Sequence, residues 1–141
     1  MIKKFRSTCI IASALDLIGD KWSLLIVRDM LLQQKKTYKE MTASEEGIAT
    51  NLLSARLKSM ESLEILTKRK LPGNKKENIY LLTEKGISLA PIIMEVVLWS
   101  DKYVRQYNPE MNAYEDAHLN KSQLVENVQE EYRKFVGRVI A

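Results

Sequence analysis

The segment from Ile87 to Trp99 is apolar on nearly every side, because only Ser88 and Glu95 interrupt it with polar side chains. A helix without a polar face has to be covered on all sides. A chain of 141 residues can cover one side of such a helix with its own core. The other side then needs a partner, and a second copy of the chain is the simplest one. Pro91 lies inside the segment and is expected to kink the helix or break it locally.

The apolar segment therefore predicts a homodimer in which two copies pair through a helix spanning Glu84–Gln106. The first helix of the chain is expected to assist this pairing, and it is predicted over residues 9–18, which are mostly apolar. Gly19 is expected to end that helix, because glycine takes the left-handed conformation without strain. The residues expected at the dimer interface are Ile10, Ile11, Ile93, Met94, Val97, Leu98 and Asp101.

Three more helices are expected between residues 20 and 63. Asp20 is placed to cap a core helix over about residues 21–33, which has too many apolar residues for one exposed face. Thr37 and Glu40 fit a capping box that opens a very short helix over residues 38–42. The third helix runs from Ile48 to about Leu63, with an apolar stripe opposite a polar face. The stripe consists of Leu53, Leu57 and Met60, and the opposite face of the small, polar or basic residues Thr50, Asn51, Ser54, Ala55 and Lys58.

After residue 64 the sequence pattern changes to that of a β-hairpin. Ile65–Leu71 and Ile79–Leu82 are short runs with partial alternation, and the turn-forming stretch Pro72–Lys76 lies between them. Thr83 then caps the helix that begins at Glu84.

The C-terminal part is expected to be a polar loop over residues 108–121, followed by an amphipathic helix over about residues 122–140. The helix is predicted because apolar residues recur at helical spacing, at Leu124, Val128, Tyr132, Phe135 and Val139. The chain is thus expected to contain a winged-helix DNA-binding and dimerisation domain, residues 1–107, and a C-terminal extension, residues 108–141.

The order of these elements is typical of a winged helix-turn-helix protein, in which three helices precede a hairpin called the wing. The expected fold class is mainly α with a small β-hairpin, a winged helix-turn-helix with extra N- and C-terminal dimerisation helices. The helix over residues 48–63 would be the recognition helix of this arrangement.

The charge distribution supports a nucleic-acid partner. The net charge of the chain is +4, with +6 on residues 1–82 and −2 on residues 83–141. The densest basic stretch is Leu66–Lys76, which contains five basic residues and no acid. Such a stretch is typical of a surface that binds a polyanion. A solvated lysine-rich surface is the alternative.

The segment from Cys9 to Tyr103 resembles the HxlR-type (MarR-like) winged helix-turn-helix regulators. The matching pieces are Cys9, Ala14–Ile26, Gly47–Ile48, Leu53–Lys58 and Tyr80–Gly86. The resemblance implies a dimeric transcription factor, from a family in which some members sense oxidants or electrophiles through the N-terminal cysteine. The chain departs from the family pattern at Ile10, where proline usually follows the cysteine, and at Ala49, where the recognition helix usually has an N-cap serine.

The recognition helix is expected to read base edges in the major groove through short side chains near its N-terminus. These residues are Thr50, Asn51, Ser54 and Ala55. Asn51 is the best candidate for a specific contact, because an amide can bond adenine at two points. The alternative for Asn51 is ordinary solvent exposure, and the alternative for Thr50 is a pure helix cap. Arg56 and Lys58 are expected to hold phosphates or support the helix, and an internal ion pair is the alternative for Arg56.

Two further elements are expected to contact the DNA backbone. Thr37, Tyr38 and Lys39 open the short helix, whose N-terminal amides favour a phosphate. A simple capping box there is the alternative and is compatible with that role. Asn74, Lys75 and Lys76 form the expected tip of the wing, which would follow the backbone or enter the minor groove.

Cys9 is a candidate redox-sensing residue. It lies at the N-terminus of a predicted helix and close to Lys3, Lys4 and Arg6, and both features favour the reactive thiolate. It could form a disulfide between protomers or take up a small thiol. The alternative is a small buried apolar residue without a redox role. A small-molecule effector in a pocket at the dimer interface is a further possibility for the signal.

Several other classes of function are not expected. No apolar run approaches the roughly 20 residues of a membrane span, and no signal peptide is recognisable, so a cytoplasmic protein without a membrane partner is expected. A lone cysteine and a lone His118 give no metal site, and no cofactor is expected. No phosphate-binding loop, nucleophile elbow or acid–base pair suggests an enzyme.

The expected function is therefore that of a sequence-specific transcription regulator, whose partners are double-stranded DNA with a pseudo-palindromic operator and a second copy of the chain. The alternative is a winged-helix protein-interaction module that does not bind DNA. The basic hairpin and the acid-free face of Thr50–Lys58 argue against this alternative.

Overall fold

The computed structural model describes residues 4–114 and 119–141, so Lys3 and His118 lie outside the described residues. Its elements are α1 (Ile10–Ile18), α2 (Ser23–Leu31), α3 (Tyr38–Thr42), α4 (Thr50–Ser62), β1 (Leu66–Leu71), β2 (Asn74–Leu82), α5 (Glu84–Ile87), α6 (Ala90–Tyr103) and α7 (Lys121–Ile140). This mainly α arrangement with one antiparallel hairpin confirms the predicted fold class.

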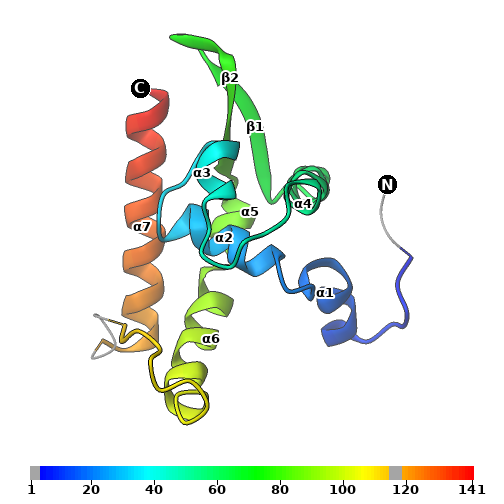
Figure 1. Cartoon of the computed structure of the whole chain (residues 1–141), viewed down its shortest axis with the longest axis vertical. Helices are drawn as coiled ribbons and strands as arrows, with labels where there is room; N and C mark the ends of the chain where they lie inside the picture. The colour runs from blue at the N-terminus through cyan, green and yellow to red at the C-terminus, as the bar shows by residue number, and fades with distance from the viewer. Residues whose placement is uncertain (1–3, 115–118) are drawn as a thin grey trace.

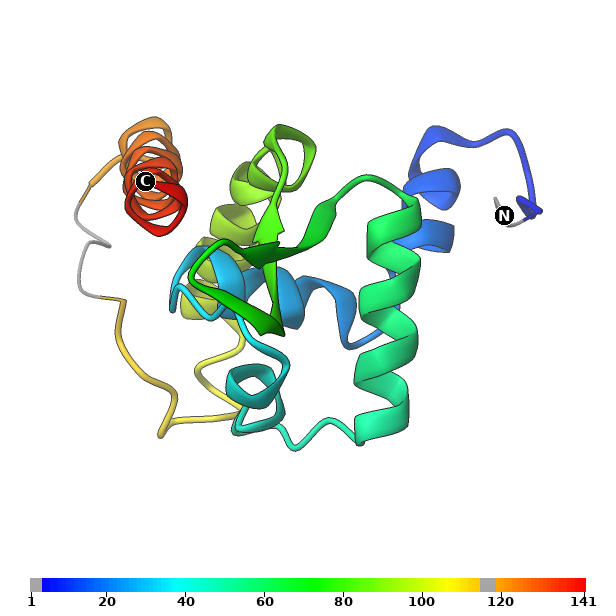
Figure 2. The same cartoon turned by 90° about the horizontal axis from the view of Figure 1, so that it is seen from above.

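The helices are arranged around α2, and the hairpin projects from one end of the molecule. Figure 1 shows α7 alongside α6 on one side of α2, with α1 and α4 on the opposite side. Figure 2, seen from above, shows the same separation of α7 from α1 and α4. None of the helices within residues 4–114 and 119–141 is both long and apolar enough to cross a membrane.

One hydrophobic core connects α2, α4, α6 and α7. Its fully buried side chains include Met30, Leu53, Met60, Met94, Leu124 and Tyr132. The apolar stripe expected on α4 is buried, as Leu53, Leu57 and Met60 are at most 2% exposed. The amphipathic pattern of the last helix is likewise observed, and α7 contributes Leu124 and Tyr132 to this same core. The C-terminal extension thus packs against the helices that precede it.

The ends of α3, α1 and α4 are determined in three different ways. The capping box of α3 is confirmed, since the Thr37 hydroxyl accepts from the Glu40 N–H and the Glu40 carboxylate accepts from the Thr37 N–H. Gly19 does follow α1, but its φ of −84° is not left-handed, so that prediction was wrong. Glycine is required there by close approach, because a Cβ atom would lie 2.4 Å from the Leu15 carbonyl oxygen. No side chain caps α4, whose N-cap is Ala49.

The hairpin turn is shorter than expected. β2 begins at Asn74, and only Pro72 and Gly73 separate the strands. Lys75 and Lys76 therefore lie in a strand rather than in a loop at the tip, which corrects the prediction. The outer part of the hairpin is exposed on both faces, so no apolar alternation marks its strands in the sequence.

The apolar segment forms two helices instead of one. α5 ends at Ile87 and α6 begins at Ala90, so the expected break occurs next to Pro91. Proline is tolerated in the first turn of α6, because the N–H it lacks would have no partner within the helix. Thr83 caps α5, and its hydroxyl accepts from the Gly86 N–H at 3.2 Å.

Candidate DNA-binding and dimerisation surfaces

The outward face of α4 carries the short side chains expected to contact bases. α4 buries Leu53 and Leu57 against the core, and the opposite side of the helix faces outward. The residues exposed on it are Thr50, Asn51, Ser54, Ala55 and Lys58. This face is polar or basic and uncharged at its N-terminal end, which suits the edges of base pairs.

Tyr38 holds the first turns of α4 against α3. Its hydroxyl donates to the Thr50 carbonyl oxygen at 2.9 Å and accepts from the Ser54 hydroxyl at 3.1 Å. Thr50 is the first residue of α4, so this contact fixes the end of the helix that lacks a side-chain cap. The predicted role of Tyr38 was a phosphate contact, and the structure gives its hydroxyl two partners within the protein.

The start of α3 is closed by its own capping box. The Glu40 carboxylate accepts from the backbone N–H groups of Lys36 and Thr37, at 3.0 Å each. Burial raises the pKa of Glu40, but these hydrogen bonds outweigh it and leave the pKa below its ordinary value. The Thr37 side chain is buried in this box, which is compatible with the predicted phosphate contact at the backbone amides of α3, and that contact stays a prediction. Lys39 is exposed and remains a candidate for a phosphate contact.

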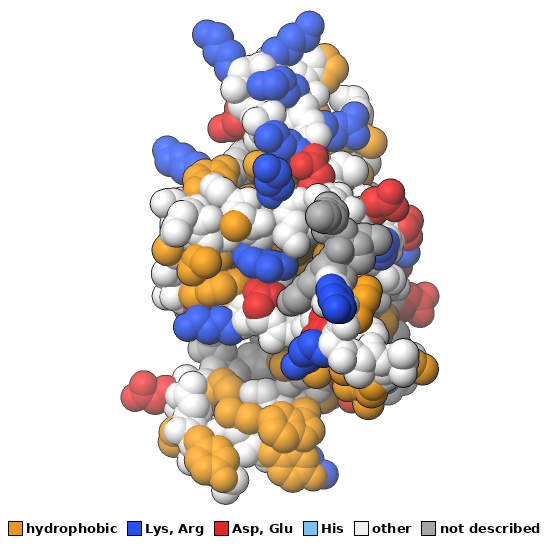
Figure 3. Space-filling view, turned by 90° about the vertical axis from the view of Figure 1, so that its right-hand side faces the viewer, with side chains coloured by type: hydrophobic (Ala, Val, Ile, Leu, Met, Phe, Trp, Pro, Cys, Tyr) orange, Lys and Arg blue, Asp and Glu red, His pale blue; other side chains and the backbone are white. Residues whose placement is uncertain are grey.

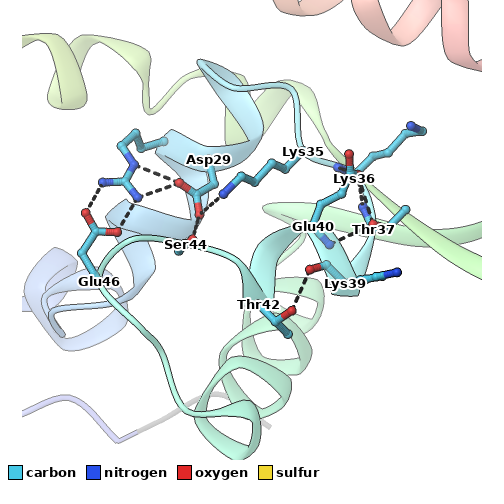
Figure 4. A network of polar contacts seen from close by, with 10 residues as sticks. Asp29, Lys35, Lys36, Thr37, Lys39, Glu40, Thr42, Ser44 and Glu46 are labelled. Atoms are coloured by element: carbon cyan, nitrogen blue, oxygen red, sulfur yellow. Dashed lines mark hydrogen bonds and ion pairs between the residues drawn. The ribbon is translucent and has the colours of Figure 1, made fainter.

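A buried carboxylate anchors the loop that leads into α4 (Figure 4). Asp29, on α2, accepts from Arg28 at 2.6 Å and from the Ser44 hydroxyl, and Lys35 lies 3.6 Å away. Arg28 also donates two hydrogen bonds, of 2.9 and 2.8 Å, to Glu46. These bonds lower the pKa of Glu46 to about 2. The loop over residues 43–47 is thus fixed to α2, which sets where α4 begins.

This ionic network was not predicted from the sequence. Its signal is Asp29 itself, a single acid inside the apolar helix α2. A buried charge needs a partner, so its presence in a core helix predicts one nearby. Ser44, which bonds to Asp29, and Glu46, which bonds to Arg28, lie in a polar loop, and no sequence pattern there predicts these contacts.

Arg56 makes an internal contact rather than facing outward with its neighbours on α4. Its Nε atom lies 3.7 Å from Asp20 Oδ2, and its guanidinium donates to the Ser59 hydroxyl at 3.3 Å. The side chain is only 25% exposed. Of the two roles considered for Arg56, the structure shows the internal ion pair.

The hairpin, or wing, carries exposed basic side chains along both strands. Lys75 and Lys76 are exposed on β2, and Asn74 Oδ1 accepts from the Lys76 N–H at 3.2 Å. Lys68, on β1, faces α4 across a hollow of about 340 Å³ that Ser54 and Lys58 also line. Figure 3 shows basic side chains gathered at the top of this face, where the wing projects.

The apolar surface of α6 is shifted from the predicted one. Ile93 is 6% exposed and Met94 0%, so both belong to the protomer's own core and cannot contact a partner. Val97 and Leu98 are half-buried, while Asp101 is exposed and pairs with Arg105 at 2.5 Å. The exposed apolar residues of α6 are instead Ile92, Val96, Trp99 and Tyr103. On α1, the expected Ile10 and Ile11 are exposed, and so is Leu15. Figure 3 shows a cluster of hydrophobic side chains at the foot of the molecule.

Cys9 is exposed and directly precedes α1. Its N–H donates to the Ser7 hydroxyl at 3.2 Å. Arg6 was expected to support the thiolate, and the structure shows its guanidinium paired with Asp16 at 2.5 Å. Ile10 and Ile11 follow Cys9 and are 88% and 71% exposed, so the thiol borders the apolar surface of α1.

Comparison with known proteins extends these findings. Residues 17–108 match the family model described as HxlR-like helix-turn-helix. The HTH-type transcriptional regulator YodB of Bacillus subtilis (strain 168) is 36% identical over 91 residues, which are 64% of this chain and 80% of YodB.

Solved structures agree with this likeness. The reduced form of YodB from B. subtilis has a TM-score of 0.58 and 35% identity, covering 69% of this chain and 95% of that chain. The redox regulator HypR in its oxidised form has a TM-score of 0.60 and 26% identity, covering 67% of this chain and 96% of that chain.

Proposed function

The chain belongs to the HxlR-like helix-turn-helix family and is a transcription regulator of that type, and from this premise we propose that it binds a pseudo-palindromic DNA site as a homodimer. The observation that carries the proposal is the outward face of α4. It presents exposed Asn51, Ser54 and Lys58 next to a wing whose exposed side chains include Lys75 and Lys76.

The recognition helix α4 enters the major groove in this proposal. Asn51 reads an adenine through two hydrogen bonds, and Ala55 contacts a thymine methyl group. Thr50 and Ser54 add contacts to the DNA through their short side chains, and Lys58 binds a phosphate farther along the helix. Tyr38 keeps this face in position, because it bonds to both Thr50 and Ser54.

The wing and α3 hold the DNA backbone. Lys75 and Lys76 project from β2 and follow the phosphates or the minor groove, while Lys39 approaches the backbone from α3. Contacts of this kind bind every sequence and position the protein, whereas the bases are read by α4.

The dimer forms through the exposed apolar surface of α1 and α6. An apolar patch of large side chains on a small protein marks a site of association. Trp99 is 61% exposed and Val96 52%, on a helix whose other side is the protomer's core. In the proposed dimer, a two-fold axis through this surface would set the two recognition helices about 34–36 Å apart, which is one turn of B-DNA.

Cys9 is the proposed sensor of oxidants. The related HypR is described as a redox regulator, and Cys9 is exposed beside the proposed dimer surface. Two Cys9 thiolates, one from each protomer, would lose two electrons to an added oxidant such as diamide, and a disulfide would form between them. The reduced diamide takes up the two electrons and two protons. The cross-link would change the spacing of the recognition helices, as would a small effector at the same interface.

Two measurements test these proposals. Binding to a duplex of random sequence, followed at increasing salt, separates a DNA-binding protein from a protein-interaction module, because phosphate contacts make the affinity fall steeply. A folded dimer that binds no duplex at low salt would favour the interaction module. The redox proposal fails if diamide and Cys9→Ser both leave the affinity for the selected site unchanged.

A further inference from the structure

Arg56 turns away from the outward face of α4 and toward the joint between α1 and α2, which we define as residues 19–22. Its Nε atom is buried and has no hydrogen-bond partner among the described residues. The nearest acid is Asp20, whose Oδ2 lies 3.7 Å away. A shift of about 1 Å would bring this pair to hydrogen-bond distance. A buried polar atom without a partner calls for a physical reason.

Asp20 is itself held rigidly in the joint. Its Oδ2 accepts from the backbone N–H groups of Trp22 and Ser23, at 3.0 Å each, and its Oδ1 accepts from the Ser23 hydroxyl. Gly19, which precedes it, has no room for a Cβ atom against the Leu15 carbonyl. The carboxylate of Asp20 is therefore bonded to the start of α2, directly after the end of α1.

The first helix is only partly packed against the protomer, with Ile18 near its end lying against the hydrophobic core. Among the residues of α1, only Asp16 is buried, and the apolar side chains of Ile10, Ile11 and Leu15 face outward. Figures 1 and 2 both show α4 lying beside α1. The Asp20–Arg56 pair thus links the recognition helix to the residues that directly follow α1, a helix that carries part of the proposed dimer surface.

We infer that Arg56 is a positioning residue, which sets the orientation of α4 relative to α1 and thereby the half-site spacing that the dimer accepts. This inference rests on the proposed function and deepens it, because it assigns the choice of spacing to a residue that does not touch DNA. A small rotation of α4 within each protomer moves both recognition helices relative to the two-fold axis. Two half-sites can then be engaged together only at one spacing.

The test measures spacer preference in variants that break the ion pair. Arg56→Gln removes the positive charge, and Asp20→Asn removes the negative charge while keeping an acceptor for the Trp22 and Ser23 N–H groups. Arg56→Lys restores a charge without the planar guanidinium. Lys58→Ala, two residues away on the exposed face of α4, is the matched control. Each protein binds palindromic duplexes whose central spacer is changed by one or two base pairs, and an isolated half-site.

The expected result is a loss of spacer selectivity without a loss of half-site recognition. Arg56→Gln and Asp20→Asn should each lower the preference for the best spacer by roughly five- to tenfold, since each dimer loses two partly exposed ion pairs. The double variant should be no worse than either single one, because both remove the same interaction. Arg56→Lys should restore part of the preference. Lys58→Ala should weaken binding to all duplexes alike.

A phosphate role for Arg56 would give a different pattern and overturn the inference. Arg56→Gln would then weaken binding to every duplex and lower the salt slope by about one, while Asp20→Asn would leave the spacer preference unchanged. Thermal unfolding of each variant shows whether it is folded. If Asp20→Asn does not fold, the spacer preference of Arg56→Gln alone decides the test. Failure of the unaltered protein to bind any duplex would instead refute the proposed function, and this inference with it.

Discussion

The backbone N–H of Leu82, the last residue of β2, donates a hydrogen bond of 2.8 Å to the hydroxyl of Tyr132 on α7. The two residues are 50 positions apart, and both are buried. Arg133 pairs with Glu84 at 2.8 Å, and Gln129 donates to the Ile87 carbonyl at 3.1 Å, directly beside this contact. The C-terminal helix α7 therefore holds α5 and the C-terminal end of strand β2 in place.

Removing the Tyr132 hydroxyl should destabilise the protein. In Tyr132→Phe the ring is kept, but the Leu82 N–H is left buried without a partner, which costs about 1–3 kcal/mol. The free energy of unfolding in urea measures this loss. Tyr107→Phe is the control, because the Tyr107 side chain is 80% exposed, and it should change stability by less than about 0.5 kcal/mol. Equal effects of the two substitutions would mean that the Tyr132–Leu82 bond contributes nothing.

The same tyrosine predicts a loss of stability in alkali. Burial raises the pKa of Tyr132 to about 12, from 10.0 for an exposed tyrosine. Since folding favours the neutral phenol, its contribution is complete below pH 10 and is lost as the pH rises toward 12. The unaltered protein should lose about 1.4 kcal/mol per pH unit in this window relative to Tyr132→Phe. Unfolding of both proteins at pH 8 and pH 11 measures the difference, and parallel losses would contradict the assignment.

The lysines of the wing should contribute affinity without specificity. Lys75→Ala and Lys76→Ala should each weaken binding to specific and random duplexes by the same factor, and lower the slope of log affinity against log salt by about one. Fluorescence anisotropy at several salt concentrations gives both quantities. Lys121→Ala is the control, because Lys121 lies at the start of α7 and pairs with Glu95 of α6. An unchanged salt slope in both wing variants would mean that the wing does not contact DNA.

The dimer should depend on the exposed face of α6 rather than on the residues first expected from the sequence. Trp99→Glu and Val96→Lys place a charge in the proposed interface and should shift the protein toward monomers by tenfold or more in Kd, as expected for about 1.4 kcal/mol or more. Sedimentation equilibrium measures this shift. Ile140→Lys at the end of α7 is a matched control, since Ile140 is 47% exposed and lies outside that surface. An unchanged dimer dissociation constant in Trp99→Glu and Val96→Lys would mean that the interface lies elsewhere.

The parts of the fold that follow from local physics were predictable from the sequence. The capping box of Thr37 and Glu40 needs only residues that are three positions apart, and it forms as expected. The helix α7 was visible because its apolar residues repeat with the period of a helix. The break beside Pro91 follows from the geometry of proline alone.

The remaining features depend on tertiary packing that local patterns do not contain. A helix that is apolar on every side gives no indication of which face meets the protomer's own core, so Ile93 and Met94 could not be told from Ile92 and Val96. The internal role of Arg56 depends on Asp20, which is 36 positions earlier in the sequence. The strand start at Asn74 was hidden because neither face of the outer hairpin is buried.

Sequence-specific DNA binding by this chain is best tested by selecting tight binders from a pool of random duplex DNA. A pseudo-palindromic motif with half-sites about one turn of B-DNA apart is expected, and Asn51→Ala should relax the preference at one position in each half-site, at a cost of about 1–3 kcal/mol. Enrichment of no motif by a folded, dimeric protein at low salt would contradict sequence-specific DNA binding by this chain.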